Sequence, residues 1–307
     1  MNLQQFIVFL SLFMATSYSI FADEQQNVSN KIIYLISPPR SSSVAFLRMM
    51  QARNDFIIMH EPTILAHHYF NHTKELQAGI ITEWYNEDAS KTFEEVKEKI
   101  LENARIGPVF IKEMAFAAKD FLYENKDFAS SSQVTFVILL RNPHHSIISF
   151  YRKVEDLFEN ISAYKFGDLI GFKACYDIFI FLKSIGKEPV MVVAEDLNLN
   201  PSKIVEQFCQ AVGIPFIENA LVWDNLGDGF SGKNEWHEIK NKEITHHWHS
   251  DAIQSTGFAQ KHSYDVDKDG KPTFDEIKNL EHKELCIKAY EENIVYYRML
   301  IGNRLKR

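Results

Sequence analysis

The sequence is poor in cysteine, with three residues in a chain of 307, at Cys175, Cys209 and Cys286. Their number is odd and they are widely scattered, so they do not form the disulfide framework that stabilises small exported domains. Cys175 and Cys209 lie within apolar helical patterns, and we expect buried thiols there. A chain of this length can bury a core large enough to be stable without disulfides.

A basic excess is also missing, because 33 Lys and Arg face 41 Asp and Glu, for a net charge of -8. Nucleic-acid-binding proteins normally carry a positive excess, so we expect no nucleic-acid partner. A local basic pocket for one phosphorylated ligand remains compatible with this balance. With 46% hydrophobic and 24% charged residues, the composition is that of a globular protein with one large α/β domain or two small ones.

A long hydrophobic run occurs only at the N-terminus, within residues 1–22. Its apolar core extends from Phe6 to Ala15, and Ala22 before Asp23 is a suitable cleavage site, so we predict a signal peptide. The protein would then be exported, to the outside, a periplasm or a Golgi lumen, with no stable membrane span after cleavage. Since this segment has no Lys or Arg, a membrane anchor is the alternative, although the run is short for a spanning helix.

After a polar connector at residues 23–30, short β-type runs alternate with helical patterns. The runs are apolar on both faces and rich in β-branched residues, which is typical of strands in a parallel sheet covered on both sides. The alternation predicts an α/β fold with a doubly wound, mostly parallel sheet flanked by helices. Strands are expected at 32–36, 56–59, 108–111, 134–140 and 189–193, and helices at 43–53, 91–105, 114–125, 144–160, 167–186 and 201–213.

The composition changes in the last quarter of the chain. We expect the α/β core to span residues 31–225, with a helical insertion at 62–105 that covers one edge of the site. Residues 226–307 begin Gly- and Asp-rich, become His-rich, and end in a helix expected from about Lys278 to Lys306. We predict that they form a C-terminal helical extension, or lid, of the same domain.

The turn after the first strand, "SPPRSSS" at residues 37–43, has the chemistry of an anion site. Ligands in open α/β sheets bind at the carboxyl ends of the strands. A helix that begins near Ser41 would present unpaired N–H groups and a positive dipole end, beside the hydroxyls of Ser41, Ser42 and Ser43 and the guanidinium of Arg40. A simple serine N-cap is the alternative. The motif G-x-x-x-x-G-K-[ST] is absent, which disfavours ordinary ATP hydrolysis.

Two further stretches follow the same design. In "VTFVILLRNPHHSIISFYR", residues 134–152, a buried strand ends at Arg141 and Ser149 lies on the next helix. A guanidinium and a hydroxyl at a strand end can hold a second phosphate with charge-assisted hydrogen bonds. In the third stretch, residues 189–216, a strand ends in Glu195-Asp196 and precedes a helix.

In this order, the three stretches resemble the sulfotransferase family that uses 3′-phosphoadenylyl sulfate (PAPS). "SPPRSSS" is similar to its loop for the donor's 5′-phosphosulfate, with Arg40 in place of the lysine of cytosolic members. "RNPHHSIISFYR" is similar to its 3′-phosphate motif, with Arg141 and Ser149 at the family's spacing. "AEDLNLNPSKIVEQFCQAVGIPF" resembles the family's "YEDL…P…LG" segment. The resemblance covers about residues 31–216.

The sequence departs from the family pattern at two places. Ser42 and Val44 stand where many members carry Gly and Thr. The family's C-terminal donor loop is represented at best by "GDGFSGK", in which Lys233 is a candidate donor contact. The donor-binding residues implied by the resemblance are Arg40, Ser41, Ser42, Ser43, Arg141, Ser149 and Lys233.

The resemblance implies in-line transfer of a sulfuryl group from PAPS, without a metal, to a hydroxyl or amine of a small-molecule or glycan acceptor. The reaction needs positioning, charge neutralisation and a base for the acceptor proton. Family members use His or Glu at comparable strand ends. We favour Glu61 or His60 from "IIMHEP" as the base, followed by Lys112 or Glu113 from "VFIKEM". Alternatively, one of these pairs only forms a salt bridge or caps a helix.

Two other motifs suggest metal binding. "DVDKDGKPTFDE" matches the EF-hand calcium loop, with ligand positions at Asp265, Asp267, Asp269, Lys271 and Glu276. No amphipathic helix pattern precedes it, so a β-hairpin that turns at Asp269-Gly270 is favoured. "THHWH" brings three histidines together, but no fourth ligand is evident, and surface or substrate-pocket positions are favoured for His246, His247 and His249.

Two alternative functions follow from these features. The first is a different nucleotide- or phosphate-handling enzyme on a P-loop-like fold, since an anion-binding turn serves many such reactions. The second is a non-catalytic calcium-binding protein that uses residues 265–276. Donor binding distinguishes the sulfotransferase hypothesis from both.

Overall fold

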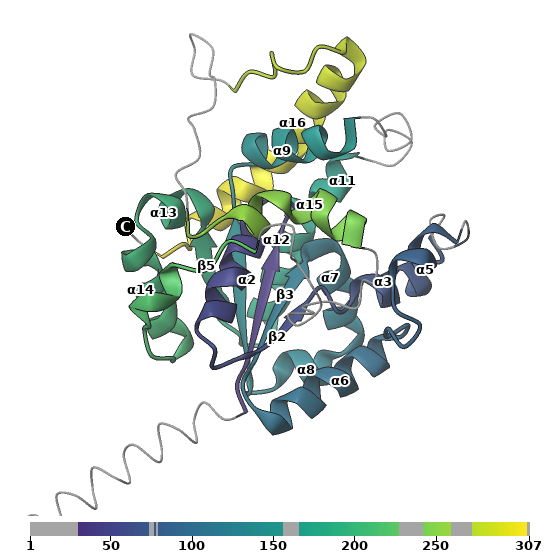
Figure 1. The fold of residues 1–307 in the computed structure, drawn as a ribbon. Helices are drawn as coiled ribbons and strands as arrows, with labels where there is room; N and C mark the ends of the chain where they lie inside the picture. The colour runs from purple at the N-terminus through teal and green to yellow at the C-terminus, as the bar shows by residue number, and fades with distance from the viewer. Residues whose placement is uncertain are drawn as a thin grey trace, which may run out of the picture.

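The computed structural model describes residues 30–73, 77, 79–155, 166–226, 242–258 and 272–305. A five-stranded sheet forms the centre, with strand order β2-β3-β1-β4-β5 and all neighbours parallel (Figure 1). The predicted doubly wound α/β fold is therefore confirmed. The strands are β1 (Ile32–Ser37), β2 (Ile57–His60), β3 (Val109–Met114), β4 (Val134–Leu140) and β5 (Val190–Val193).

Helices cover both faces of the sheet, because the strands carry apolar side chains on both faces. The face that includes Tyr34 packs against one set of helices, and the face that includes Leu35 packs against another. The first set comprises α6 (Phe93–Ile106), α7 (Ala115–Glu124), α8 (Lys126–Ser130), α9 (Pro143–Val154), α11 (Phe166–Ile170), α12 (Phe172–Ser184) and α16 (Leu280–Ile301). The second comprises α2 (Ser43–Ala52), α13 (Ala194–Leu199), α14 (Pro201–Val212) and the 3-10 helix η2 (Glu218–Leu221).

The central strand β1 shows why the strands have no polar face. Residues Ile32–Ser37 are all buried. On one face of the sheet, the ring of Tyr34 in β1 stacks on Phe121 of α7, with ring centroids 6.1 Å apart. On the other face, Phe46 of α2 stacks on Phe110 of the neighbouring strand β3 at the same separation. Aromatic pairs at such distances add to the free energy gained by burial.

Three more helices contribute residues to a cavity at the carboxyl ends of the strands. They are α3 (Ile64–Phe70), α5 (Ile80–Trp84) and α15 (Lys242–Gln254). Figure 1 shows α15 crossing above α2, near the ends of the strands. The first two belong to the insertion predicted at residues 62–105, whereas α15 lies in the predicted C-terminal extension.

The chain after α16 returns to the sheet. The Leu305 amide donates to the carbonyl of Met191 in β5, and Arg304 pairs with the buried carboxylate of Asp196 at 3.3 Å. This contact covers the outer edge of β5, which would otherwise present unpaired backbone groups. Thus α16 and the residues after it pack on the core, while the domain boundaries themselves stay a prediction.

The observed helix bounds differ from the expected ones for local reasons. The helix expected at 167–186 is interrupted at Gly171, whose φ of 79° is left-handed and incompatible with a continuous helix. The final helix begins at Leu280, because the Asn279 side chain accepts hydrogen bonds from the amides of Glu281 and His282. Of the helix expected at 144–160, the structure describes α9.

Other sequence-based expectations concern the cysteines and the N-terminus. The three cysteines are free and buried, as predicted for Cys175 and Cys209. In the part of the chain that the structure describes, no helix is both long and apolar enough to cross a bilayer. Residues 1–22, with the predicted signal peptide, lie outside the described residues.

Gly171 offers a test of this local geometry. A Cβ at this position would make only ordinary contacts, 3.7 Å from Ala115 Cβ and from Pro39 Cδ. Gly171→Ala should therefore lower the free energy of unfolding through backbone strain alone, by about 1 kcal/mol after the entropy change of the unfolded chain is subtracted. Urea unfolding measures the change. Gly302→Ala is the control, because φ is -61° there and an added Cβ would meet no other part of the described chain within 4 Å. Equal stabilities of the two variants would contradict the explanation.

Candidate active site

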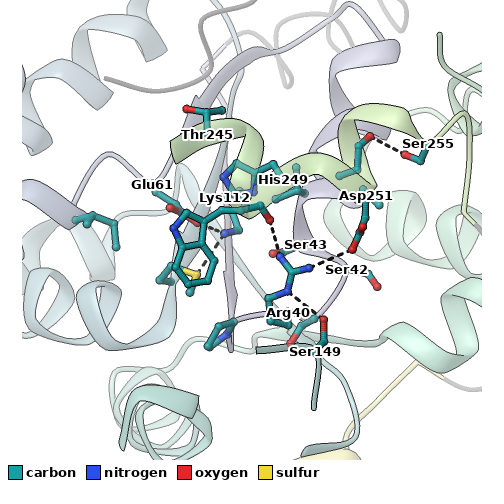
Figure 2. A pocket seen from close by; sticks show the side chains of 18 of the residues that line it. Arg40, Ser42, Ser43, Glu61, Lys112, Ser149, Thr245, His249, Asp251 and Ser255 are labelled. Carbon is teal, nitrogen blue, oxygen red and sulfur yellow. Dashed lines mark hydrogen bonds and ion pairs between the residues drawn. The ribbon is translucent and has the colours of Figure 1, made fainter. Parts of the chain in front are cut away.

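A cavity of about 300 Å³ lies where β1, β2 and β3 end (Figure 2). The loop between β1 and α2 forms one wall, the ends of β2 and β3 form a second, and α15 forms a third. The three strands are neighbours in the sheet, so their carboxyl ends meet at one edge, where open α/β folds bind ligands. The predicted position of the site is therefore where the structure has a cavity.

The loop from Pro39 to Ser43 has an unusual backbone. Arg40 and Ser42 have left-handed conformations, with φ of 60° and 63°. For residues other than glycine this costs about 1–2 kcal/mol, and such strain is concentrated at functional sites. As a consequence α2 begins at Ser43 instead of near Ser41, and Ser42 is its N-cap residue without a side-chain cap hydrogen bond.

The loop serines leave hydrogen-bonding capacity unused. The hydroxyl oxygens of Ser41 and Ser42 are buried, and among the described residues neither has a hydrogen-bond partner. Burial of a polar group without a partner is costly. Hydroxyl donors beside an arginine and a helix N-terminus suit the oxygen atoms of a phosphate or sulfate group. The loop therefore has the chemistry to hold an anionic group.

The guanidinium of Arg40 has three partners, one on α9 and two on α15. Its Nε donates to Ser149 Oγ of α9 at 3.1 Å, its Nη1 donates to the carbonyl of Trp248 at 2.6 Å, and its Nη2 pairs with Asp251 Oδ2 at 3.2 Å (Figure 2). Burial is the main cause that lowers the pKa of Arg40 from its ordinary value, with the charge of Arg141 acting in the same direction and that of Asp251 opposing it. Arg40 and Ser149, both predicted donor contacts, are thus brought together.

Arg141 is placed differently from Arg40. It is buried, and its Nη1 donates to the Arg40 carbonyl at 2.8 Å. The cavity wall includes Ser149 but, within the described residues, it does not include Arg141. The side chain therefore supports the loop from behind, where its charge still contributes to the positive potential of the site. Its predicted contact with a 3′-phosphate stays a prediction.

Two of the four candidate bases line the cavity. Glu61, at the end of β2, forms an ion pair with Lys112 of the neighbouring β3, and both side chains are part of the wall (Figure 2). The pair joins adjacent strands, because His60 and Lys112 are register partners. Glu61 also has a left-handed backbone, with φ of 53°. The arrangement places a carboxylate and an ammonium side by side at the cavity.

The other two candidates lie behind this wall. The His60 side chain is fully buried, with Nε2 3.6 Å from Glu61 Oε1. The Glu113 carboxylate is also buried and accepts hydrogen bonds from the amides of Thr63, at 2.9 Å, and Met114, at 2.7 Å. Burial and the nearby charge of Glu61 raise the pKa of Glu113 to about 7. Because Thr63 precedes α3, Glu113 anchors the start of that helix.

Helix α15 brings residues to the site that sequence reasoning did not assign to it. Trp248, His249 and Asp251 line the cavity, and the His249 ring lies edge-on to the buried His60 ring, with centroids 5.0 Å apart. The "THHWH" motif indicated a substrate pocket as one possibility for these histidines. Of the other two, His246 is exposed, and His247 donates through Nε2 to the Lys153 carbonyl at 2.8 Å.

The remaining predicted site residues lie outside the cavity wall or outside the described residues. Lys233 and the calcium-loop positions Asp265, Asp267, Asp269 and Lys271 belong to the second group. Glu276 is described, and both of its oxygens accept hydrogen bonds from Arg152, at 2.8 and 2.7 Å. Within the described ranges no cluster of three His, Cys, Asp or Glu side chains could hold a metal ion.

Comparison with known proteins identifies a family. The sequence model described as "Sulfotransferase domain" matches residues 30–271, well over half of the chain. A curated relative, "Branched-chain-amino-acid aminotransferase-like protein 2" of Arabidopsis thaliana, is 22% identical over 204 residues, which are 63% of this chain and 32% of that protein. The chain thus spans about a third of the length of the curated relative it matches.

Two solved structures are similar in fold. One is the "Sulfotransferase Domain from the Synechococcus PCC 7002 Olefin Synthase", with a TM-score of 0.43 at 17% identity, covering 85% of this chain and 94% of the other. The second is the "Sulfotransferase Domain from the Curacin Biosynthetic Pathway", with a TM-score of 0.44 at 16% identity and coverages of 90% and 99%.

The pKa of Glu113 predicts a pH dependence of stability. The folded protein keeps a proton on this carboxyl at pH values at which the unfolded chain, with an ordinary pKa near 4.5, has released it. The free energy of unfolding should therefore fall as pH rises from about 4.5 to 7, by up to about 3 kcal/mol, and this contribution should be constant above that range.

Urea unfolding at a series of pH values, compared between wild type and Glu113→Gln, isolates this contribution. The variant should lack the part of the slope that belongs to Glu113. Glu98→Gln, at an exposed position of α6, is the control and should keep the wild-type slope. Parallel curves for wild type and Glu113→Gln would show that the Glu113 carboxyl does not titrate in this range.

Proposed function

The chain belongs to the sulfotransferase domain family, and we propose that it moves a sulfuryl group from PAPS to a hydroxyl or amine of a small-molecule or glycan acceptor. The observation that carries the proposal is the Arg40 loop. There a guanidinium, a helix N-terminus and two buried hydroxyls that have no partner among the described residues are together at the cavity. An anionic group bound there would receive charge-assisted hydrogen bonds from several directions.

The donor supplies an activated sulfuryl group and a phosphate leaving group. Arg40 and the N–H groups at the start of α2 would neutralise the negative charge that develops on the leaving oxygen atoms. Ser149, which accepts from Arg40 Nε, would keep the guanidinium in position. Arg141 would fix the loop backbone through the Arg40 carbonyl and contribute a second positive charge. Catalysis would thus depend on positioning and electrostatics.

Glu61 is the proposed general base. It is the carboxylate among the four candidates that lines the cavity, whereas His60 and Glu113 are buried behind it. The ion pair with Lys112 holds the carboxylate in place at the cavity, where it can take a proton from an acceptor hydroxyl or amine. Lys112 would also stabilise negative charge on the oxygen atoms of the transferring group.

The acceptor would bind next to this pair, on the apolar side of the cavity. That side is formed by Ile64, Trp84, Tyr85, Met114 and Phe116. We further propose that the protein is exported by the predicted signal peptide and works in a compartment to which the donor is supplied. No observation on the described residues favours the calcium-binding alternative, and Glu276 is engaged with Arg152.

Donor binding is the first test. Titration calorimetry of the full chain with adenosine 3′,5′-bisphosphate (PAP), the product left by PAPS, should show binding that Arg40→Ala weakens about 10- to 100-fold, since a charge-assisted hydrogen bond contributes about 1.5–3 kcal/mol. Arg141→Ala should also weaken it, because the loop loses its support. Arg152→Ala, which removes an exposed arginine from the same helix as Ser149, should bind like wild type. A folded wild type that binds ATP but not PAP would refute the proposal and favour another nucleotide-handling enzyme.

The base is tested by the rate of transfer. Glu61→Gln should lower kcat with PAPS and a panel of hydroxyl and amine acceptors by about 10²- to 10⁴-fold, the usual contribution of general base catalysis, while the Kd for PAP stays near the wild-type value. Glu87→Gln, at an exposed position, should keep the wild-type rate. If His60→Asn rather than Glu61→Gln abolishes transfer without loss of folding, the base is assigned to the wrong residue.

A further inference from the structure

We propose that Asp251 is a counter-anion built into the donor site. It pairs with the Arg40 guanidinium until an anionic ligand displaces it, and this competition sets the affinity for the donor. The inference deepens the proposed function and rests on it as far as the identity of the ligand is concerned. Its basis is the pairing of Arg40 Nη2 with Asp251 Oδ2 at 3.2 Å, inside the cavity that both residues line.

The three partners of Arg40 differ in charge. Ser149 Oγ and the Trp248 carbonyl are neutral acceptors, at 3.1 and 2.6 Å, and both can remain in place when an anion approaches. Asp251 carries a negative charge, which attracts the guanidinium but repels a phosphate or sulfate near the same nitrogen. A multiply charged ligand therefore competes with Asp251 and leaves the two neutral contacts intact.

Exposure shows which partner can move. The Arg40 side chain is 15% exposed, whereas that of Asp251 is 64% exposed. An ion pair with an exposed carboxylate is held weakly, and water can solvate the carboxylate as soon as it leaves the guanidinium. Arg40 is fixed by its other contacts and by burial. Displacement of Asp251 thus requires a side-chain rotation into solvent, with no movement of the loop.

Helix α15 has other attachments that keep it in place without this pair. Arg48 of α2 donates through Nη1 to the carbonyls of Ala252 at 2.8 Å and Ile253 at 3.3 Å, which belong to the last turn of the helix and have no partners within it. Ile253 is fully buried, and Lys153 Nζ donates to Ser250 Oγ at 3.0 Å. Removal of the Asp251 charge should therefore change the site electrostatically and leave α15 docked.

A counter-anion of this kind has a consequence for turnover. The bisphosphate product binds through the same arginine as the donor, so tight product binding would slow each cycle. When the product begins to leave, Asp251 can pair with Arg40 again and assist the release. The carboxylate thus weakens the binding of donor and product together, and it should affect dissociation rates more than association rates.

The experiment compares wild type with Asp251→Asn, Asp251→Ala and Glu243→Gln, all as full chains. Glu243→Gln is the matched control, since it removes one negative charge from an exposed position of the same helix, eight residues or about 12 Å away. Calorimetry gives the Kd for PAP and for inorganic pyrophosphate at two salt concentrations, and stopped-flow displacement gives the dissociation rate of PAP. Thermal unfolding verifies that each variant is folded.

We expect both Asp251 variants to bind PAP and pyrophosphate about tenfold more tightly than wild type, which corresponds to about 1.4 kcal/mol, with a slower dissociation of PAP. Glu243→Gln should match wild type. The difference should shrink at high salt, because screening weakens the repulsion. Asp251→Asn is informative because its carbonyl can still accept a hydrogen bond from Arg40 without carrying a charge.

Other outcomes separate the two proposals. If Asp251→Ala binds both ligands more weakly and Asp251→Asn binds them like wild type, Asp251 only orients Arg40, and the counter-anion inference is overturned while the donor site stands. If pyrophosphate binding tightens in both variants but no form binds PAP, the counter-anion inference holds and the PAPS donor is refuted. If no form binds either ligand, both are wrong.

Discussion

The site depends on one constraint, which is that a parallel sheet must be covered on both faces. Successive parallel strands are joined by crossover helices, so the five described strands point the same way and end at the same edge. The residues that follow β1, β2 and β3 therefore meet without any other device. Arg40 follows the first of these strands, Glu61 follows the second, and Lys112 lies within the last residues of the third.

The loop after β1 then makes this shared edge a candidate anion site, at some cost in backbone strain. Arg40 and Ser42 are both left-handed, a conformation that favours glycine, the residue that many sulfotransferases carry in place of Ser42. Interactions from three sides stabilise the strained loop: Arg141 binds the Arg40 carbonyl, while Ser149 and α15 hold the guanidinium.

The strands, and the polar residues that the candidate site takes from the strand ends, could be predicted from the sequence because their signals are local. A two-sided apolar run specifies a buried strand, and an arginine with serines directly after it specifies what the strand end carries. The break at Gly171 was missed because a glycine inside a helical pattern does not by itself reveal its φ. The register of β2 against β3, which joins Glu61 to Lys112, depends on strand order, and strand order has no local signature.

The position of α15 was beyond sequence reasoning for a related reason. One of its hydrogen bonds with Arg40 is accepted by a main-chain carbonyl, that of Trp248, and any residue type supplies such an acceptor. Its attachment through Arg48 likewise ends on carbonyls. Only the side chains of "THHWH" gave a signal, and they left surface and substrate-pocket positions open.

Four charged side chains of the described cavity wall form two ion pairs. This arrangement affects how a protein with a negative net charge can bind an anionic ligand. Among the described residues of the cavity wall, Lys112 pairs with Glu61 and Arg40 pairs with Asp251, so each of these two cations has a carboxylate partner before any ligand arrives. The first pair joins two strand ends and has one nearly buried partner, whereas the second includes an exposed carboxylate on a different helix. The free energy needed to separate a pair rises with burial. A polyanion should therefore replace Asp251 and leave Glu61 in place, which frees Arg40 for the proposed donor and keeps the proposed base beside the cavity.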